Sequence, residues 1–132
     1  RLMTCWMDGE VDAYPTSDPE QKRDYVSRLM PLTSQVALRW QPAGAGYWAE
    51  AVVDAAEKAD RLSADDERDT QRIPPGGTPG YTVLTLRSGF VVMDDLQLTV
   101  ALENVTDEDY RIHGSGVNEP GRNLVVQADW TF

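Results

Sequence analysis

The last ten residues of the chain alternate between apolar and polar side chains, and this period of two constrains the fold more than any other feature. In residues 123–132 one parity carries only apolar side chains: Leu124, Val126, Ala128, Trp130 and Phe132. The other parity is mostly polar. Successive side chains of a β-strand point to opposite faces, so this segment is predicted to be a strand with two different environments.

Two segments before it follow the same rule. Residues 81–92 alternate Leu84 and Leu86 with Thr85 and Arg87, and residues 96–104 alternate in the same way. Only the tripeptide 93–95 separates these two segments, which predicts a tight hairpin turn.

Three earlier segments carry a weaker signal. Residues 31–41 alternate, and residues 2–12 are compatible with a strand. Residues 47–60 are ambiguous, because their alanines and a stripe from Trp48 to Leu62 also fit a helix. A lone helix would interrupt an otherwise continuous meander, so its neighbours favour a strand. The fold is predicted to be all-β, an antiparallel up-and-down meander of about six strands.

The predicted connections alternate in length. Long ones, at about residues 13–30, 61–80 and 105–122, alternate with short turns at 41–46 and 93–95. Outer-membrane barrels have short turns on one side and long loops on the other. This pattern indicates part of a larger transmembrane β-barrel.

Aromatic residues gather near both predicted rims. The short-turn rim would carry Trp40, Tyr47, Trp48, Phe90, Trp130 and Phe132, and the opposite rim Tyr14, Tyr81 and Tyr110. Two aromatic girdles around an apolar band are typical of membrane-spanning strands. A soluble sandwich with aromatic residues in its core is the alternative interpretation.

Composition excludes several function classes. With 22 acidic and 12 basic residues the formal net charge is -10, which argues against nucleic acid as a partner. The sequence contains no run of about 18 apolar residues, so no transmembrane helix is predicted. The single cysteine, Cys5, and single histidine, His113, provide neither a disulfide nor a zinc-ligand set, and no nucleophile elbow is present. We therefore expect no enzyme activity, no cofactor and no metal site.

Cys5 is interpreted as a small residue in a strand. The acidic run of Asp65, Asp66, Glu67 and Asp69 lacks the ligand spacing and the central glycine of a calcium loop, so it is interpreted as a solvated loop.

Five segments resemble, in the right order, the barrel of TonB-dependent outer-membrane receptors. Trp6-Met7-Asp8-Gly9-Glu10 resembles the end of an earlier barrel strand, and residues 79–89 resemble the penultimate hairpin. Residues 102–111, with the sequence LENVTDEDYR, are similar to the family's ENLxDxxYR segment. Residues 113–116 and 120–123, together with the terminal Phe132, are similar to its last loop and last strand.

This resemblance implies that residues 1–132 are the C-terminal portion of a receptor barrel of about 22 strands in the bacterial outer membrane. The implied function is active uptake of a scarce chelate, such as a siderophore, haem or cobalamin, and hence transport of the iron-uptake type. The implied partners are the remainder of the barrel, the plug domain, TonB, the barrel-assembly machinery and the lipid bilayer. The plug and the TonB-contacting box have no counterpart in these residues, so TonB would be contacted through a missing N-terminal part.

In this barrel, alternate residues would face lipid and lumen. The lipid-facing set would be Leu84, Leu86, Phe90, Leu98, Val100, Leu102, Leu124, Val126, Ala128 and Trp130. The lumen-facing set would be Thr85, Arg87, Gln97, Thr99, Glu103, Gln127 and Asp129. Within it, Arg87 and Glu103 are predicted to form a cross-strand ion pair.

Two groups of residues are candidate functional sites. Tyr110, Arg111, His113 and Arg122 in the last long loop are candidates for binding an anionic substrate. Leu124, Val126, Ala128, Trp130 and Phe132 resemble the C-terminal signal read by the barrel-assembly machinery, because an apolar strand can be captured by edge pairing.

Two other hypotheses remain open beside the transporter. The first is a soluble β-rich domain that binds a small ligand in its interior. The second is an enzyme of mixed class that uses the acidic run. Fractionation separates the transporter from the soluble domain, because only the transporter requires detergent.

Overall fold

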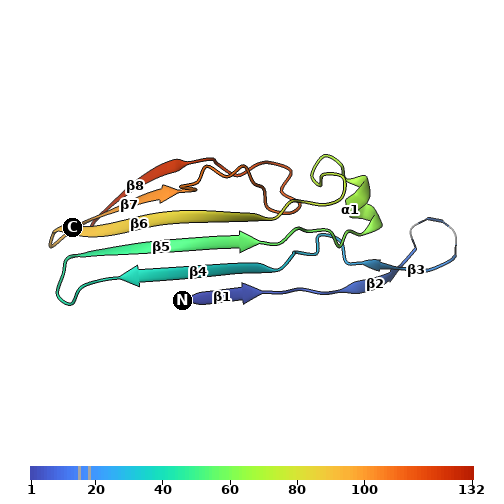
Figure 1. Ribbon diagram of the computed structural model, residues 1–132, viewed down its shortest axis with the longest axis horizontal. Coiled ribbons are helices and arrows are strands. Elements are labelled where there is room, and N and C mark those ends of the chain that lie inside the picture. Colours follow the sequence, from blue (N-terminus) through green and yellow to red (C-terminus); the bar gives the residue numbers. More distant parts are fainter. Residues whose placement is uncertain (15, 18) are drawn as a thin grey trace.

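A computed structural model describes residues 1–14, 16–17 and 19–132, and its main feature is a single six-stranded antiparallel sheet (Figure 1). The strands are β1 (Leu2–Cys5), β4 (Thr33–Trp40), β5 (Tyr47–Ala56), β6 (Tyr81–Met93), β7 (Leu96–Glu103) and β8 (Asn123–Trp130). They lie in the order β1-β4-β5-β6-β7-β8, so strands after β4 pair with their neighbours in sequence. The all-β meander and the strand at residues 47–56 are confirmed.

The first predicted strand is wrong in one respect, because it is divided in two. After β1 the chain leaves the sheet, and residues 10–13 form β2 (Glu10–Ala13), which pairs with β3 (Lys22–Tyr25). The division falls beside Gly9, whose carbonyl accepts a hydrogen bond from the Val26 amide at 3.1 Å. The predicted loop over residues 13–30 therefore contains a strand of its own, while its residues 15 and 18 lie outside the described part of the chain.

The long connection at residues 61–80 contains the short helix α1 (Ala64–Arg68). Ser63 caps this helix: its hydroxyl accepts from the Asp66 amide, and the Asp66 carboxylate accepts from the Ser63 amide. No helix in the described residues is long and apolar enough to span a membrane.

Cross-strand partners show which side chains share a face. Leu86 of β6 lies opposite Ala51 of β5 and Leu102 of β7, and Leu102 lies opposite Leu124 of β8. The same registers place all ten predicted lipid-facing residues on one face, which we call the apolar face, together with Val36, Leu38 and Trp40 of β4. The predicted lumen-facing residues all lie on the opposite, polar face.

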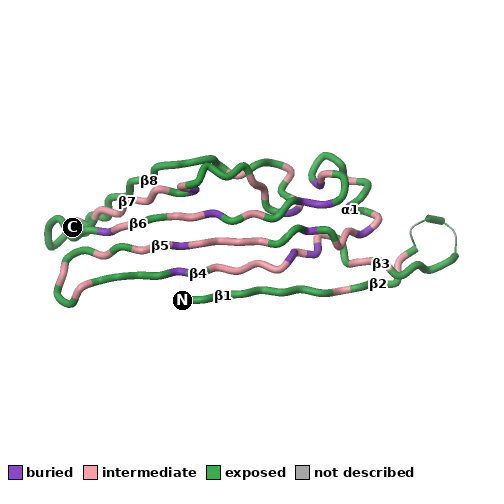
Figure 2. Tube along the Cα trace, viewed as in Figure 1, coloured by how far each residue is buried: buried purple, intermediate pink, exposed green. Residues whose placement is uncertain are grey.

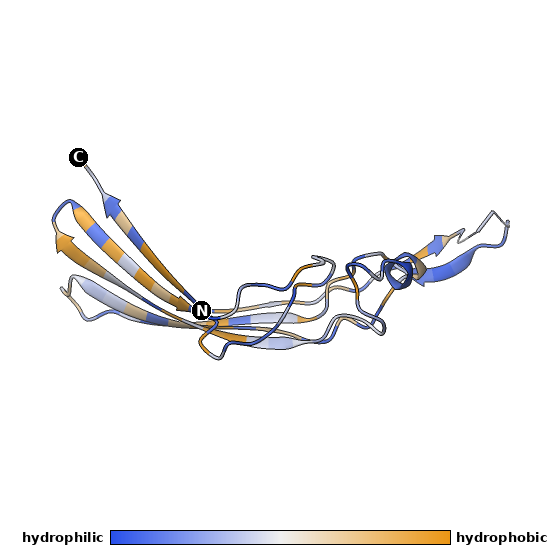
Figure 3. Cartoon of the chain, turned by 90° about the horizontal axis from the view of Figure 1, so that it is seen from above, coloured by the Kyte–Doolittle hydropathy of each residue, from blue (hydrophilic) through white to orange (hydrophobic). Residues whose placement is uncertain are grey.

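The apolar face is uncovered in this chain, and β8 is exposed along its whole length (Figure 2). Leu38 is 71% exposed, and Leu124 and Trp130 are each 65% exposed. Side chains of this kind are the ones that a soluble protein normally buries. Apolar and polar colours alternate along the strands near the C-terminus (Figure 3).

The buried apolar residues are few and lie elsewhere. Ala37, Val52 and Val83 are buried near the middle of the polar face, where their registers place them. Leu29, Ala59 and Ile73 are buried among the long connections. The packed part of the molecule is therefore the polar face and the loops, not the apolar face.

Short turns and long connections lie at opposite ends of the sheet. Turns 41–46 and 93–95 lie at one end, and α1 and the β2–β3 hairpin lie at the other (Figure 1). The predicted segregation of the connections is confirmed. The sheet is open, with β1 and β8 at its edges, and has the architecture of a barrel segment.

The aromatic residues follow the predicted rims only in part. At the short-turn end the ring centroids of Trp40 and Tyr47 lie 5.8 Å apart on the apolar face. Phe90 and Trp130 lie on the same face. The prediction of a second girdle is wrong for Tyr81, which lies on the polar face and contacts Tyr110 at 4.5 Å between ring centroids. The distance of a residue from the rim does not determine which face its side chain occupies. The face alternates from one residue of a strand to the next.

Trp48 corrects the girdle prediction at the short-turn end. Its register with Gly89 places it on the polar face, so it belongs to neither girdle. Tyr14, assigned to the opposite rim, follows β2 and lies outside the six-stranded sheet.

The predicted partner of Arg87 is also wrong. Arg87 forms its ion pair with Glu50, its direct partner on β5, and not with Glu103. Registers explain the difference: Arg87 lies opposite Ala101 on β7, so Glu103 is displaced along the strand. Glu103 instead accepts a hydrogen bond from Asn123 at 3.2 Å.

Candidate functional site

A cavity of about 480 Å³ lies between the polar face of the sheet and the last long loop. Strand β6 contributes Tyr81, Val83 and Thr85 to its wall, because these alternate residues share the polar face. The loop contributes Tyr110 and residues 119–121. Its volume falls in the range typical of small-molecule sites. We call it the acidic cavity.

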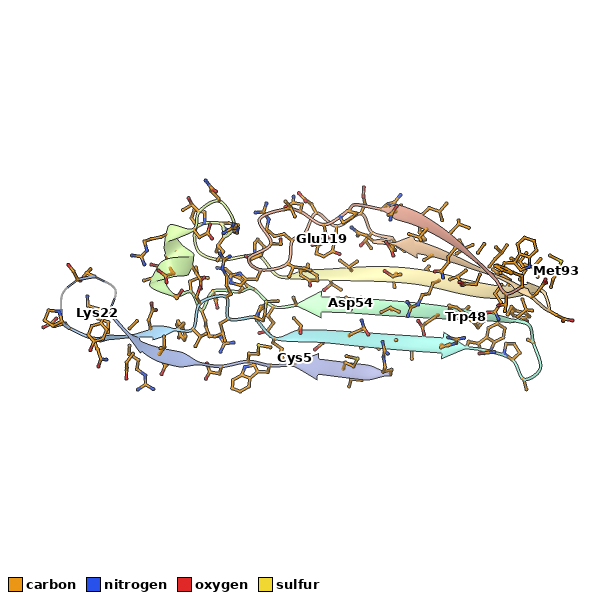
Figure 4. All side chains as sticks on the ribbon, turned by 180° about the vertical axis from the view of Figure 1, so that it is seen from behind. Cys5, Lys22, Trp48, Asp54, Met93 and Glu119 are labelled. Atoms are coloured by element: carbon orange, nitrogen blue, oxygen red, sulfur yellow. The ribbon has the colours of Figure 1, made fainter. Side chains whose placement is uncertain are left out.

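Three carboxylates line the acidic cavity, and Figure 4 labels two of them, Asp54 of β5 and Glu119 of the loop. The third is Glu103, at the end of β7. No lysine or arginine is among the lining residues, and within the described residues none of the three carboxylates forms an ion pair. Opposed negative charges without a cationic partner favour a positively charged ligand and disfavour an anion.

The two tyrosine rings, which contact each other at a tilt of 46°, add a second kind of contact. Aromatic faces attract cations through their quadrupole, so Tyr81 and Tyr110 complement the carboxylates. Burial raises the pKa of Tyr110, and the neighbouring Glu119 carboxylate raises it further. The Tyr110 hydroxyl therefore stays protonated at neutral pH and can donate a hydrogen bond into the cavity.

The four candidate residues of the last loop do not converge on one point. Tyr110 lines the acidic cavity. Arg111 donates from Nε to Asn118 Oδ1 at 2.9 Å, and Arg122 donates from Nε to the Val105 carbonyl at 3.0 Å. His113 is buried, with Nδ1 2.9 Å from the Thr78 hydroxyl. Substrate binding by these four residues stays a prediction.

The interpretation of the acidic run as a solvated loop is wrong for Asp66. Asp66 is only 1% exposed, and its carboxylate accepts hydrogen bonds from the Ser27 hydroxyl at 2.8 Å and from the amides of Arg28 and Ser63. Burial alone raises the pKa of Asp66, but these donors outweigh it and hold the pKa below 3.8. The spacing of Ser63 and Asp66, typical of a helix cap, is the sequence signal that could have indicated this position.

Arg28 joins the same network from the first long connection. Its guanidinium lies 3.7 Å from Asp66, pairs with Asp69, and donates to the Gly114 carbonyl at 3.4 Å. Its backbone is held at φ 63°, a left-handed conformation that costs about 1–3 kcal/mol in a residue other than glycine. Hydrogen bonds from the Arg28 amide to Asp66 offset this strain. Arg28 therefore ties the three long connections together.

Within the described residues, no group of three His, Cys, Asp or Glu side chains is arranged to hold a metal ion. Cys5 is a free, exposed thiol at the end of β1, so its predicted position in a strand is confirmed.

The proposed assembly signal forms the exposed edge strand of the sheet. Leu124, Val126, Ala128 and Trp130 lie on the apolar face of β8, which pairs with β7 along one edge only. Trp130 also donates from Nε1 to Asp95 Oδ2 at 2.9 Å, which fixes the indole against the 93–95 turn. Recognition of this strand by an assembly machinery stays a prediction.

Comparisons with known proteins give one informative result. No protein-family model and no curated protein sequence matches the chain. Among solved structures, the copper transporter OprC matches with a TM-score of 0.67 at 18% identity. The match covers 83% of this chain but only 18% of the transporter, so the chain spans less than a fifth of that protein's length. The likeness shows that the chain has the fold of part of that transporter.

Proposed function

We propose that the chain is part of an outer-membrane active transporter that takes up a scarce chelate, of the siderophore, haem or cobalamin class. The observation that carries this proposal is the division of the sheet into one exposed apolar face and one polar face with a ligand-sized cavity. Strands that separate lipid from an aqueous lumen need this division.

Three further observations support the proposal. Short turns and long connections lie at opposite ends of the sheet, as in outer-membrane barrels. Both edges, β1 and β8, have a free side where neighbouring barrel strands can pair. A copper transporter shares the fold. The rest of the barrel, a plug domain, TonB and the barrel-assembly machinery are the partners that this proposal requires.

The acidic cavity narrows the expected cargo. Asp54, Glu103 and Glu119 would repel a strongly anionic chelate and attract a metal cation or a chelate with positive charge. The matching structure is that of a copper transporter, which is compatible with cationic cargo. Among scarce chelates, those of neutral or positive charge therefore fit this segment best.

Two adjacent residues of β8 provide the test. Val126 lies on the apolar face and Gln127 on the polar face, one position apart on the same strand. In the full-length protein folded into lipid vesicles, Val126→Arg is expected to cost about 2–4 kcal/mol of folding free energy, while Gln127→Arg changes it by about 0.5 kcal/mol or less. Equal costs for the two variants would contradict a lipid-facing apolar face.

Localisation is tested separately. The full-length protein is expected in the membrane pellet, and its release should require detergent. Recovery in the soluble fraction without detergent would favour the second candidate function, a soluble β-rich domain that binds a small ligand.

A further inference from the structure

Contacts of His113 and its neighbour Gly114 bring the three long connections together. These connections lie at the end of the sheet that carries α1 (Figure 1). Thr78, from the second connection, forms a hydrogen bond with His113 Nδ1. Arg28, from the first connection, donates to the carbonyl of Gly114, next to His113. His113 therefore lies where the last loop docks onto the other two connections.

The burial of His113 leaves little space for water to solvate a charged imidazole. The residue is 8% exposed, and its Nε2 has no hydrogen-bond partner among the described residues. The cavity beside it has a volume of about 10 Å³, enough for one water molecule at most. The imidazolium carries an N–H on both ring nitrogens, so Nε2 would be a donor for which the described residues offer no acceptor, and Nδ1 could no longer accept from Thr78.

Charged and titratable groups approach His113 from every element packed against it. They are Arg28 from the first connection, Asp66 from the second, and Glu57, Tyr81 and Arg111 around the small cavity. The Asp66 carboxylate attracts an imidazolium, but its hydrogen bonds are already made with Ser27, Ser63 and Arg28. Arg28 repels an imidazolium.

We propose that His113 is a pH-sensitive latch, which holds the last loop against the other two connections when it is neutral and releases the loop when it is protonated. The same loop carries Tyr110 and Glu119 over the acidic cavity, so release would expose that cavity. A consequence for uptake rests on the proposed transport function, whereas the latch itself does not.

The direction of the pH effect follows from the burial. Burial lowers the pKa of His113 from 6.5, the nearby Asp66 opposes this, and Arg28 adds to the lowering. A group with a lowered pKa binds fewer protons in the closed state, so acid favours the open state. The closed state of the last loop therefore begins to lose stability as the pH falls below 6.5. The pKa values of Asp66 and Asp69 are held below 3.8, so the ion pairs of Arg28 persist while His113 titrates.

Hydrogen exchange of the full-length protein in detergent tests the latch. Amides of residues 105–122 are expected to lose protection several-fold between pH 7 and pH 5, after correction for intrinsic exchange, while the strands β5–β7 keep theirs. His113→Gln, which stays neutral, should abolish this loss. Val117→Ala, in the same loop but with a side chain that is 65% exposed, should behave like the wild type.

The result that overturns the latch is an equal acid response in the wild type and in His113→Gln. If His113→Gln does not fold, the midpoint pH at which the wild-type loop loses protection tests the latch instead. A midpoint below pH 6.5 and above the carboxylate range near pH 4 supports the latch, and a midpoint outside this interval overturns it. Because His113 is the only histidine in these 132 residues, a full-length sample with labelled histidine confined to this segment gives a single imidazole NMR signal, which assigns that midpoint. Loss of the latch in a protein that still folds into membranes would leave the transporter proposal intact.

Discussion

Trp48 of β5 and Gly89 of β6 are direct cross-strand partners, and the Trp48 indole occupies the space that a side chain at position 89 would need. A Cβ atom at Gly89 would lie 2.3 Å from Trp48 Nε1. On the polar face, the Arg39 guanidinium lies 4.0 Å from the centroid of the Trp48 ring. The missing side chain at Gly89 of β6 therefore leaves space for a cation–π contact between β4 and β5.

Gly89→Ala is expected to destabilise the full-length protein by about 1–3 kcal/mol, because the indole must leave its position and the overpacked sheet must adjust. Denaturant unfolding in lipid vesicles measures the cost. Gly46→Ala is the matched control, since a Cβ there would meet Val91 at an ordinary 3.4 Å. The same loss of stability in both variants would show that the indole does not restrict position 89.

Asp66→Asn is expected to cost about 1.5–3 kcal/mol of unfolding free energy, because a buried carboxylate loses its charge-assisted hydrogen bonds. The pKa of Asp66 lies below 3.8 in the folded state, so its contribution is present above pH 3.8 and is lost as the pH falls through the folded value. The variant should therefore lose less stability in acid than the wild type. Asp65→Asn, whose side chain is 74% exposed, should have little effect at any pH. A comparable loss in both variants would contradict the role assigned to Asp66.

Much of the sheet could be predicted from the sequence, because alternation is a local property. The faces of β6, β7 and β8 follow from parity alone, and residues 47–56 form a strand because their neighbours on both sides are strands. The ends of these strands follow from the turn residues between them.

The remainder depends on which distant segments meet, and one sequence does not contain that information. The partner of Arg87 is decided by the β5–β6 register, and the burial of Asp66 by Ser27 and Arg28, almost forty residues away. The pairing of β2 with β3 needs the break at Gly9. His113 looks like a solvated loop residue until Thr78 and Arg28 are placed beside it.

Phe132→Glu is expected to lower the amount of full-length protein in the outer membrane while its synthesis stays the same. The reason is that Phe132 extends the row of apolar side chains on edge strand β8, and a charge there weakens its capture by pairing. Immunoblots of membrane and total fractions measure the effect. Thr131→Glu, at the neighbouring position, is the control. Unchanged membrane levels of Phe132→Glu would show that the Phe132 ring has no role in assembly.

Residues 1–132 expressed alone are expected to self-associate in buffer without detergent. Six strands cannot close a barrel of transporter width, so β1 and β8 each keep a row of unpaired N–H and C=O groups. The apolar face is uncovered, with Leu38, Leu124 and Trp130 all at least 65% exposed, and large exposed apolar patches favour association in water.

Light scattering at micromolar concentration measures this association, and a mild detergent should reduce it by covering the apolar face. Replacing Leu124 and Val126 together by lysine should also reduce it, because charge on the apolar face opposes burial of that face against another copy. Replacing Asn123 and Gln127 by lysine, on the polar face of the same strand, should not reduce the association. A monodisperse monomer of the wild-type segment would contradict the prediction, because a stable open sheet in water needs no neighbouring strands and no lipid to cover it.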